Sequence, residues 1–201
     1  MRRPYQPLLS LVPEAWVVLG CLTAIGALLV FGASSDLALP FLVLLFLAIR
    51  FYADAQPQVE SRPRGVLAPA DGVVIHRREC HDPVLGREAI RIVLKPRILG
   101  GYCLRAPVTG HVAPVGAERA SRIRTEDGQD VVVRVTRGLT GSARPVMMPV
   151  GERVGQGRRC GLRRLAREIE LLVPADSRVE VRLGQQVRSG QTVLATMLKK
   201  A

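Results

Sequence analysis

Histidines and cysteines, the residues that most often bind transition metals, are few in this chain of 201 residues: it has three and four of them. His76 and His81 lie on either side of Cys80 at a spacing that is not typical of metal ligands, and His111 is expected at the edge of a strand. The cysteines show no paired spacing of the kind that a disulfide framework or a zinc site requires; they are Cys21, Cys80, Cys103 and Cys160. We predict reduced thiols and no metal site.

Four short stretches stand out by residue type and follow one another along the chain. Residues 51–55 read FYADA, residues 69–72 read PADG, residues 105–112 read RAPVTGHV, and residues 159–174 read RCGLRRLAREIELLVP. Asp-Gly is a favoured turn dipeptide, so a structural role for Asp71 in a turn is one interpretation of the second stretch. The order of all four stretches supports another interpretation.

Taken in this order, the stretches resemble one family, the phosphatidylserine decarboxylases, in the short form found in bacteria and archaea. The first is similar to the family's F-F-R-D-P element, and the second matches its P-A-D-G. The third is similar to H-V-N-R-x-P-x-x-G-x-V, and the fourth to R-F-G-M-I-R-F-G-S-R-V-D-V-Y-L-P. The resemblance runs from about residue 15 to the C-terminus and depends on the order and spacing of the motifs.

The family's chemistry depends on a pyruvoyl group that is made from the chain itself. The serine of a Gly-Ser pair attacks the preceding carbonyl, the resulting ester breaks by β-elimination, and the new N-terminal pyruvoyl group forms a Schiff base with the substrate amine. The resemblance therefore implies a membrane-bound enzyme of phospholipid metabolism that decarboxylates phosphatidylserine to phosphatidylethanolamine. It also implies that Asp71 is the general base.

The chain departs from this pattern where the pyruvoyl group should form. The Gly-Ser pair aligns with Ala166 and Arg167, and the family's histidine aligns with Tyr102. Arginine has no hydroxyl to attack or to eliminate, so we expect no pyruvoyl cofactor. Ser142, in the only Gly-Ser pair of the chain, is 25 residues before Arg167 and remains an alternative processing site.

The resemblance thus predicts a decarboxylase homologue that is a pseudoenzyme, with Arg105 and Arg164 as candidate ligands of a phospholipid head group. Its expected partners are an anionic phospholipid membrane and either an active paralogue or a second copy of the chain. Two other functions stay open: an active decarboxylase with an unorthodox site, and a barrel-sandwich adaptor or carrier. For a carrier, none of the lysines lies in a suitable hairpin; they are Lys95, Lys199 and Lys200.

The net charge of +12 falls almost entirely on the residues after Arg50 and comes mostly from arginine. Aromatic residues make up only 4% of the chain, too few for base stacking, so we predict no nucleic-acid partner. Cations beside anionic head groups each contribute on the order of 1 kcal/mol to membrane binding. An arginine-rich composition without a specific partner is the alternative.

Residues 15–49 contain a single charged residue, Asp36. We expect a transmembrane helical hairpin, with helices at about residues 15–31 and 37–51, in a membrane anchor that covers residues 1–52. Arginines flank the hairpin and none lies in its loop, so the positive-inside rule places both ends in the cytoplasm of a bacterial-type cell membrane. A monotopic hairpin that dips part-way into the bilayer is the alternative.

Residues 53–65 read as a linker, and residues 66–201 as a mainly β, barrel-sandwich-like decarboxylase domain. Short apolar runs separated by turn residues predict its strands; they are residues 73–75, 89–94, 131–135, 169–173, 179–183 and 192–197. Residues 151–157 and 184–190 share the spacing G-x-x-V-x-x-G. Each copy predicts a tight turn, a buried valine and a second turn.

Overall fold

The computed structural model describes residues 9–11, 13–32, 38–55, 62–97, 101–116, 120–135, 149–163 and 166–198. The chain divides into two compact units, Met1–Gln56 and Pro57–Ala201. The division falls inside the segment that was expected to be a linker.

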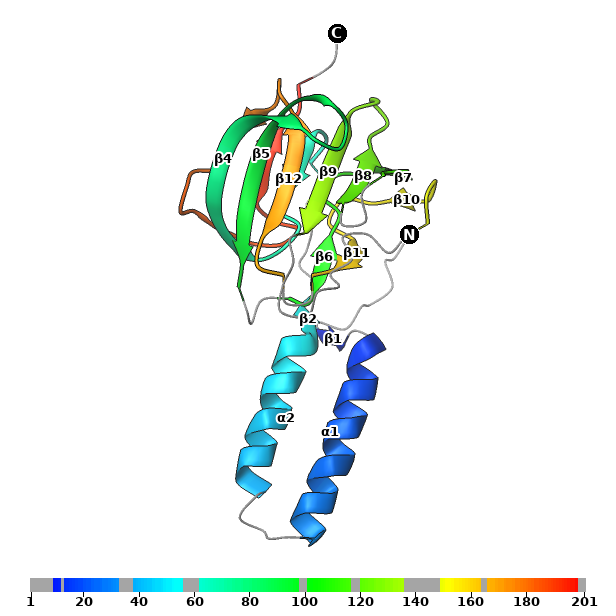
Figure 1. Cartoon of the computed structure of the whole chain (residues 1–201), viewed down its shortest axis with the longest axis vertical. Coiled ribbons are helices and arrows are strands. Elements are labelled where there is room, and N and C mark those ends of the chain that lie inside the picture. The colour runs from blue at the N-terminus through cyan, green and yellow to red at the C-terminus, as the bar shows by residue number, and fades with distance from the viewer. Residues whose placement is uncertain are drawn as a thin grey trace. The chain divides into compact units, whose positions relative to one another are not determined.

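The first unit is a helical hairpin closed by a small sheet (Figure 1). Helix α1 covers Pro13–Gly32 and helix α2 covers Ala38–Tyr52, while strands β1 (Leu9–Leu11) and β2 (Ala53–Ala55) pair antiparallel. Prolines stand in the first turn of both helices, where the missing N–H is tolerated. Strand β2 is a difference from the prediction, because these residues were expected to begin the linker.

Apolar side chains cover much of the surface of the two helices. The most exposed include Trp16, Val17, Ile25, Leu28, Leu39 and Phe46. The two predicted helices are confirmed, and each of their four ends lies within two residues of its predicted position. Among the residues that the structure describes, however, no helix is long and apolar enough to cross a membrane, so the predicted spans are not found there.

The second unit is built on an eight-stranded antiparallel sheet in the order β10-β7-β8-β9-β12-β5-β4-β14 (Figure 1). Its strands are β4 (Gly72–Asp82), β5 (Arg87–Pro96), β7 (Gly110–Ala113), β8 (Ala120–Arg124), β9 (Asp130–Val135), β10 (Arg153–Val154), β12 (Ile169–Pro174) and β14 (Gln186–Val187). Two small sheets complete the unit. Strand β6 (Cys103–Arg105) pairs with β11 (Arg159–Leu162), and β15 (Val193–Thr196) lies between β3 (Gly65–Leu67) and β13 (Arg178–Val179).

The mainly β class is therefore confirmed, and five of the six apolar runs lie mostly within strands. Alternate residues of the three central strands point into one core: Ile90, Ile92 and Leu94 on β5, Val131, Val133 and Val135 on β9, and Ile169, Leu171 and Val173 on β12. The exception is the run at residues 179–183, of which only Val179 belongs to a strand. Its alternation of apolar and charged residues predicts a longer strand than the short β13 supplies.

The two G-x-x-V-x-x-G segments adopt the predicted conformation. Their valines, Val154 and Val187, are buried, while their glycines adopt left-handed backbone angles that a side chain would strain; these are Gly151, Gly157, Gly184 and Gly190. Val154 lies in β10 and Val187 in β14. The repeat thus forms the two edge strands of the large sheet.

Candidate functional site

Asp71 lies directly before β4, where three segments meet. Its carboxylate accepts a hydrogen bond from the backbone N–H of Ser189 at 2.8 Å, and its carbonyl accepts one from the N–H of Arg97 at 3.1 Å. The hydroxyl of Ser189 donates to the carbonyl of Pro69 at 3.1 Å. The half-buried carboxylate therefore ties the turn after β14 to the beginning of β4.

A buried guanidinium lies in the electrostatic field of this carboxylate. Arg163 follows β11 and is only 2% exposed. Its Nε donates to the carbonyl of Gly101 at 3.0 Å, and its Nη1 donates to the carbonyl of Arg97. Burial lowers the pKa of Arg163, and the negative charge of Asp71 opposes that shift. Arg163 thus joins the end of β5, the beginning of β6 and the region of Asp71.

Two positions that align with the family's site residues, Tyr102 and Ala166, contact the backbone of Arg163. Its N–H donates to the carbonyl of Tyr102 at 3.0 Å, and its own carbonyl accepts from the N–H of Ala166 at 3.2 Å. Tyr102 and Ala166 are buried, whereas Arg167 is exposed at a bend. The structure therefore brings Asp71, Tyr102 and the 166–167 pair into one neighbourhood. A methyl group and a guanidinium do not fit the chemistry of a pyruvoyl-forming pair.

The two candidate head-group ligands have different outcomes. Arg105 on β6 is 5% exposed, and its Nη1 donates to the carbonyl of Gly157 at 3.1 Å, which leaves little guanidinium surface for a head group. Arg164 lies outside the described residues, as do Gly141 and Ser142.

Cys160 on β11 is not an alternative nucleophile. Cys160 lies at an irregularity in the pairing of β11 with β6, and its Sγ is 3.6 Å from the carbonyl of Leu104. Burial, with a contribution from Cys103, raises the pKa of Cys160 to about 12, although Arg105 acts in the opposite direction. The thiol is therefore protonated at neutral pH. In the described residues no group of histidine, cysteine and acidic side chains could hold a metal ion.

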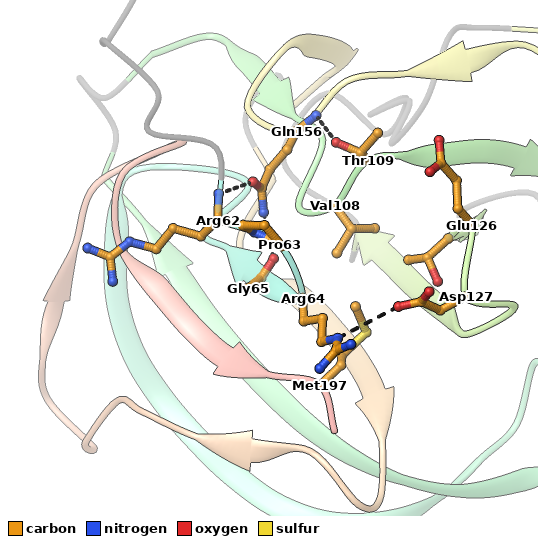
Figure 2. Close-up of a pocket in the computed structure, with 11 residues that line it drawn as sticks. Arg62, Pro63, Arg64, Gly65, Val108, Thr109, Glu126, Asp127, Gln156 and Met197 are labelled. Carbon is orange, nitrogen blue, oxygen red and sulfur yellow. Dashed lines mark hydrogen bonds and ion pairs between the residues drawn. The ribbon is translucent and has the colours of Figure 1, made fainter. Parts of the chain in front are cut away.

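A separate pocket of about 410 Å³ opens beside β3 (Figure 2), and no sequence motif predicted it. Gln156 spans its wall: the side-chain Nε2 donates to the carbonyl of Gly65 at 2.6 Å, and Oε1 accepts from the N–H of Arg62 at 2.9 Å. Arg64 lies 3.8 Å from Asp127, at a left-handed backbone angle that is unusual for a side chain of this size. These polar groups are engaged with one another, so the pocket presents no evident catalytic constellation.

Several arginines form what we call the ion-paired face, on the side of the large sheet opposite the main core. Asp130 accepts from Arg122 at 2.8 and 2.7 Å and from Arg124 at 3.2 Å. Burial favours the neutral form of Asp130, but the hydrogen bonds and charges of both arginines outweigh it, so the pKa of Asp130 lies below its usual value. Glu170 lies 3.7 Å from Arg91 and 3.4 Å from Arg134, measured between nitrogen and oxygen atoms.

Fold and sequence together define a mainly β domain, preceded by a helical hairpin, that carries the motif order described above. The sequence is 30% identical to the phosphatidylserine decarboxylase proenzyme of Nitrosomonas europaea over 213 aligned residues, which cover 97% of this chain and 99% of the relative. It is 28% identical to the proenzyme of Burkholderia vietnamiensis, with 92% and 94% covered, and 27% identical to that of Aromatoleum aromaticum, with 93% and 95% covered. The chain belongs to the phosphatidylserine decarboxylase family.

Two further comparisons add little. No family model matches the sequence. Among solved structures, glucose permease IIA from Mycoplasma capricolum is similar with a TM-score of 0.45 and 19% identity, over 65% of this chain and 93% of that one. We draw no conclusion from a similarity of that size.

Proposed function

We propose that this chain is a membrane-bound phosphatidylserine decarboxylase homologue that does not catalyse the family's reaction. The observation that carries the proposal is the pair Ala166 and Arg167, which aligns with the Gly-Ser pair that the family cleaves. Neither side chain has a hydroxyl or a thiol. Self-cleavage and pyruvoyl formation need one at this position, because the same atom attacks the carbonyl and then leaves by elimination.

The surroundings of Asp71 support the same conclusion. In the register of the family motif, Arg163 occupies the place of an isoleucine, so a buried cation has replaced an apolar side chain. The carboxylate of Asp71 lies in the field of that cation and accepts a backbone hydrogen bond from Ser189. In this chain the carboxylate holds charge and backbone in place, a role that requires no proton transfer.

The helical hairpin supports the membrane part of the proposal. Large exposed apolar surfaces on a small unit mark sites of interaction with lipid or protein, and both helices carry such surfaces. We assign them to lipid at the cytoplasmic side of a bacterial cell membrane, because Arg2, Arg3 and Arg50 flank the hairpin. The second unit then faces anionic head groups, and an active paralogue or a second copy is a further possible partner.

Intact mass spectrometry of the purified full chain under denaturing conditions tests the proposal. We expect one uncut chain of 21.9 kDa and no release of CO₂ from phosphatidylserine. The Nitrosomonas europaea relative, prepared in the same way, is the positive control for both measurements. A fragment with a blocked N-terminus that begins at residue 142 or 167 would overturn the proposal. CO₂ release by the uncut chain would overturn it as well and would indicate an unorthodox site.

A further inference from the structure

Cations gather around the edge strand β14, at one end of the large sheet. We call this group the basic edge; its members are Arg77, Lys95, Arg97, Arg182 and Arg188. All five side chains are exposed. They come from the middle of β4, the end of β5 and the two turns that flank β14, so only folding brings them together.

Strand pairing and hydrogen bonds fix these positions. Gln186 of β14 is opposite Val73 of β4, which in turn is opposite Lys95 of β5. The guanidinium of Arg97 donates to the side chain of Gln186. On the other side, Nη1 of Arg77 donates to the carbonyl of Val181 at 3.3 Å, next to Arg182.

The turns on either side of β14 are also held in place. The N–H of Arg182 donates to the side chain of Gln185 at 2.9 Å, and the N–H of Arg188 donates to the hydroxyl of Thr192, also at 2.9 Å. Ser189 is bound to Asp71, as described above. The arginines are therefore presented from a fixed backbone.

No member of the basic edge forms an ion pair with another described residue. Asp71 borders the edge, but it lies in the field of the buried Arg163. Like charges held close together destabilise the isolated fold, and an external anion relieves that repulsion. The charge pattern therefore indicates an anionic partner.

An apolar side chain stands in the middle of these cations. Leu183 is 64% exposed in the turn between Arg182 and Gly184, and Gly184 adopts a left-handed angle that helps to make the turn sharp. An exposed leucine flanked by arginines is the pattern of a segment that lies in a lipid interface: the leucine enters the boundary of the acyl chains while the cations meet the phosphates. Nucleic acid needs stacking aromatics instead, and the turns and strand ends that form the basic edge contain none.

We propose that the basic edge, with Leu183 at its tip, docks on an anionic phospholipid surface. The inference rests on the membrane location in the proposed function. It adds the surface of the domain that binds anionic lipid. It makes the hairpin responsible for attachment to any bilayer, and the basic edge responsible for the preference for anionic lipid.

The test compares binding of the full chain to phosphatidylcholine vesicles and to vesicles in which about a third of the lipid is phosphatidylglycerol, enough to give an anionic surface. The variant Arg182→Gln/Arg188→Gln is measured beside Arg158→Gln/Arg178→Gln. The second variant loses the same charge from exposed arginines outside the basic edge, one of them on β13. The preference is the ratio of the binding constants for anionic and for phosphatidylcholine vesicles. We expect this ratio to fall about tenfold in the edge variant, because each cation that lies near the head groups contributes to binding. In the control variant it should fall about twofold or less, because its two arginines lie outside the basic edge. Leu183→Ser should weaken binding to the anionic vesicles further.

Three results would overturn the inference: no anionic preference in the unaltered chain, equal losses in both double variants, or a loss in the edge variant that appears with single-stranded DNA and not with vesicles. The outcome is independent of the test for decarboxylation, which reads chain cleavage and CO₂. Binding to phosphatidylcholine vesicles by all variants reports the hairpin alone, so failure of the membrane location is recognised separately.

Discussion

The arginines of the ion-paired face and those of the basic edge belong to one sheet, yet their charges have different surroundings. On the face, Asp130 and Glu170 each lie between two guanidinium groups. At the edge, five cations share no ion pair with a described residue. The first group holds neighbouring strands together, whereas the second remains available to an anion from outside. A net charge of +12 counts both groups alike and does not reveal the difference.

The largest expected effect comes from removing the centre of the ion-paired face. Asp130→Ala leaves Arg122 and Arg124 close together with no carboxylate between them, and breaking a largely buried pair in this way costs about 3 kcal/mol. Calorimetry of the thermal unfolding of the full chain in detergent measures this loss of stability. Asp127→Ala, in the turn between β8 and β9, is the matched control. Its exposed pair with Arg64 contributes less than about 1 kcal/mol. Equal losses in the two variants would contradict the comparison.

A second, smaller effect links the ion-paired face to pH. The pKa of Asp130 is lowered in the folded chain, so its contribution to stability is complete above the unfolded value of 3.8 and is lost as the pH falls below it. We expect Asp130→Asn to flatten the decrease in the unfolding temperature between neutral pH and about pH 3, by an amount equivalent to about 1 kcal/mol. If the variant and the unaltered chain lose stability in parallel over this range, another carboxylate is responsible.

The smallest expected effect is at the basic edge. Arg182→Gln/Arg188→Gln should change the free energy of unfolding by about 0.5 kcal/mol or less, because these exposed side chains form no ion pair that would be broken. At low salt the variant should be slightly more stable than the unaltered chain, since two repelling charges are gone. Calorimetry at two salt concentrations measures this. A large destabilisation would show that the two arginines support the fold, and it would remove the contrast with the ion-paired face.

Local patterns predicted the core strands because burial on one side of a strand leaves a period of two in the sequence. Ile169, Leu171 and Val173 show this directly, and the glycine spacing of the repeat predicted the tight turns and the buried valine of each copy. The run at residues 179–183 has the same alternation but forms mostly irregular backbone. In this run the two valines face the domain core although most of the backbone is not a strand. Alternation alone therefore does not establish a strand.

The candidate site was predictable only in part. Motif order identified Asp71, Tyr102, Ala166 and Arg167, and the structure brings these positions together. Nothing in the arginine-rich stretch around Arg163 distinguishes this buried guanidinium from its described neighbours, because its hydrogen-bond acceptors are carbonyls more than 60 residues earlier. The basic edge escaped prediction for the same reason. The segment around β14 is hydrogen-bonded to side chains that lie 89 and 104 residues earlier, and only the fold unites them.

The edge strands of the large sheet, β10 and β14, are only two residues long. A strand from another molecule that aligned with β10 or β14 would find only two residues of strand backbone to pair with, and very short edge strands are one way in which natural sheets resist aggregation. Glycine turns close on both sides of each strand and prevent it from lengthening. Pairing of another chain along β10 or β14 is therefore disfavoured, although β14 covers only Gly72 and Val73 of the longer strand β4.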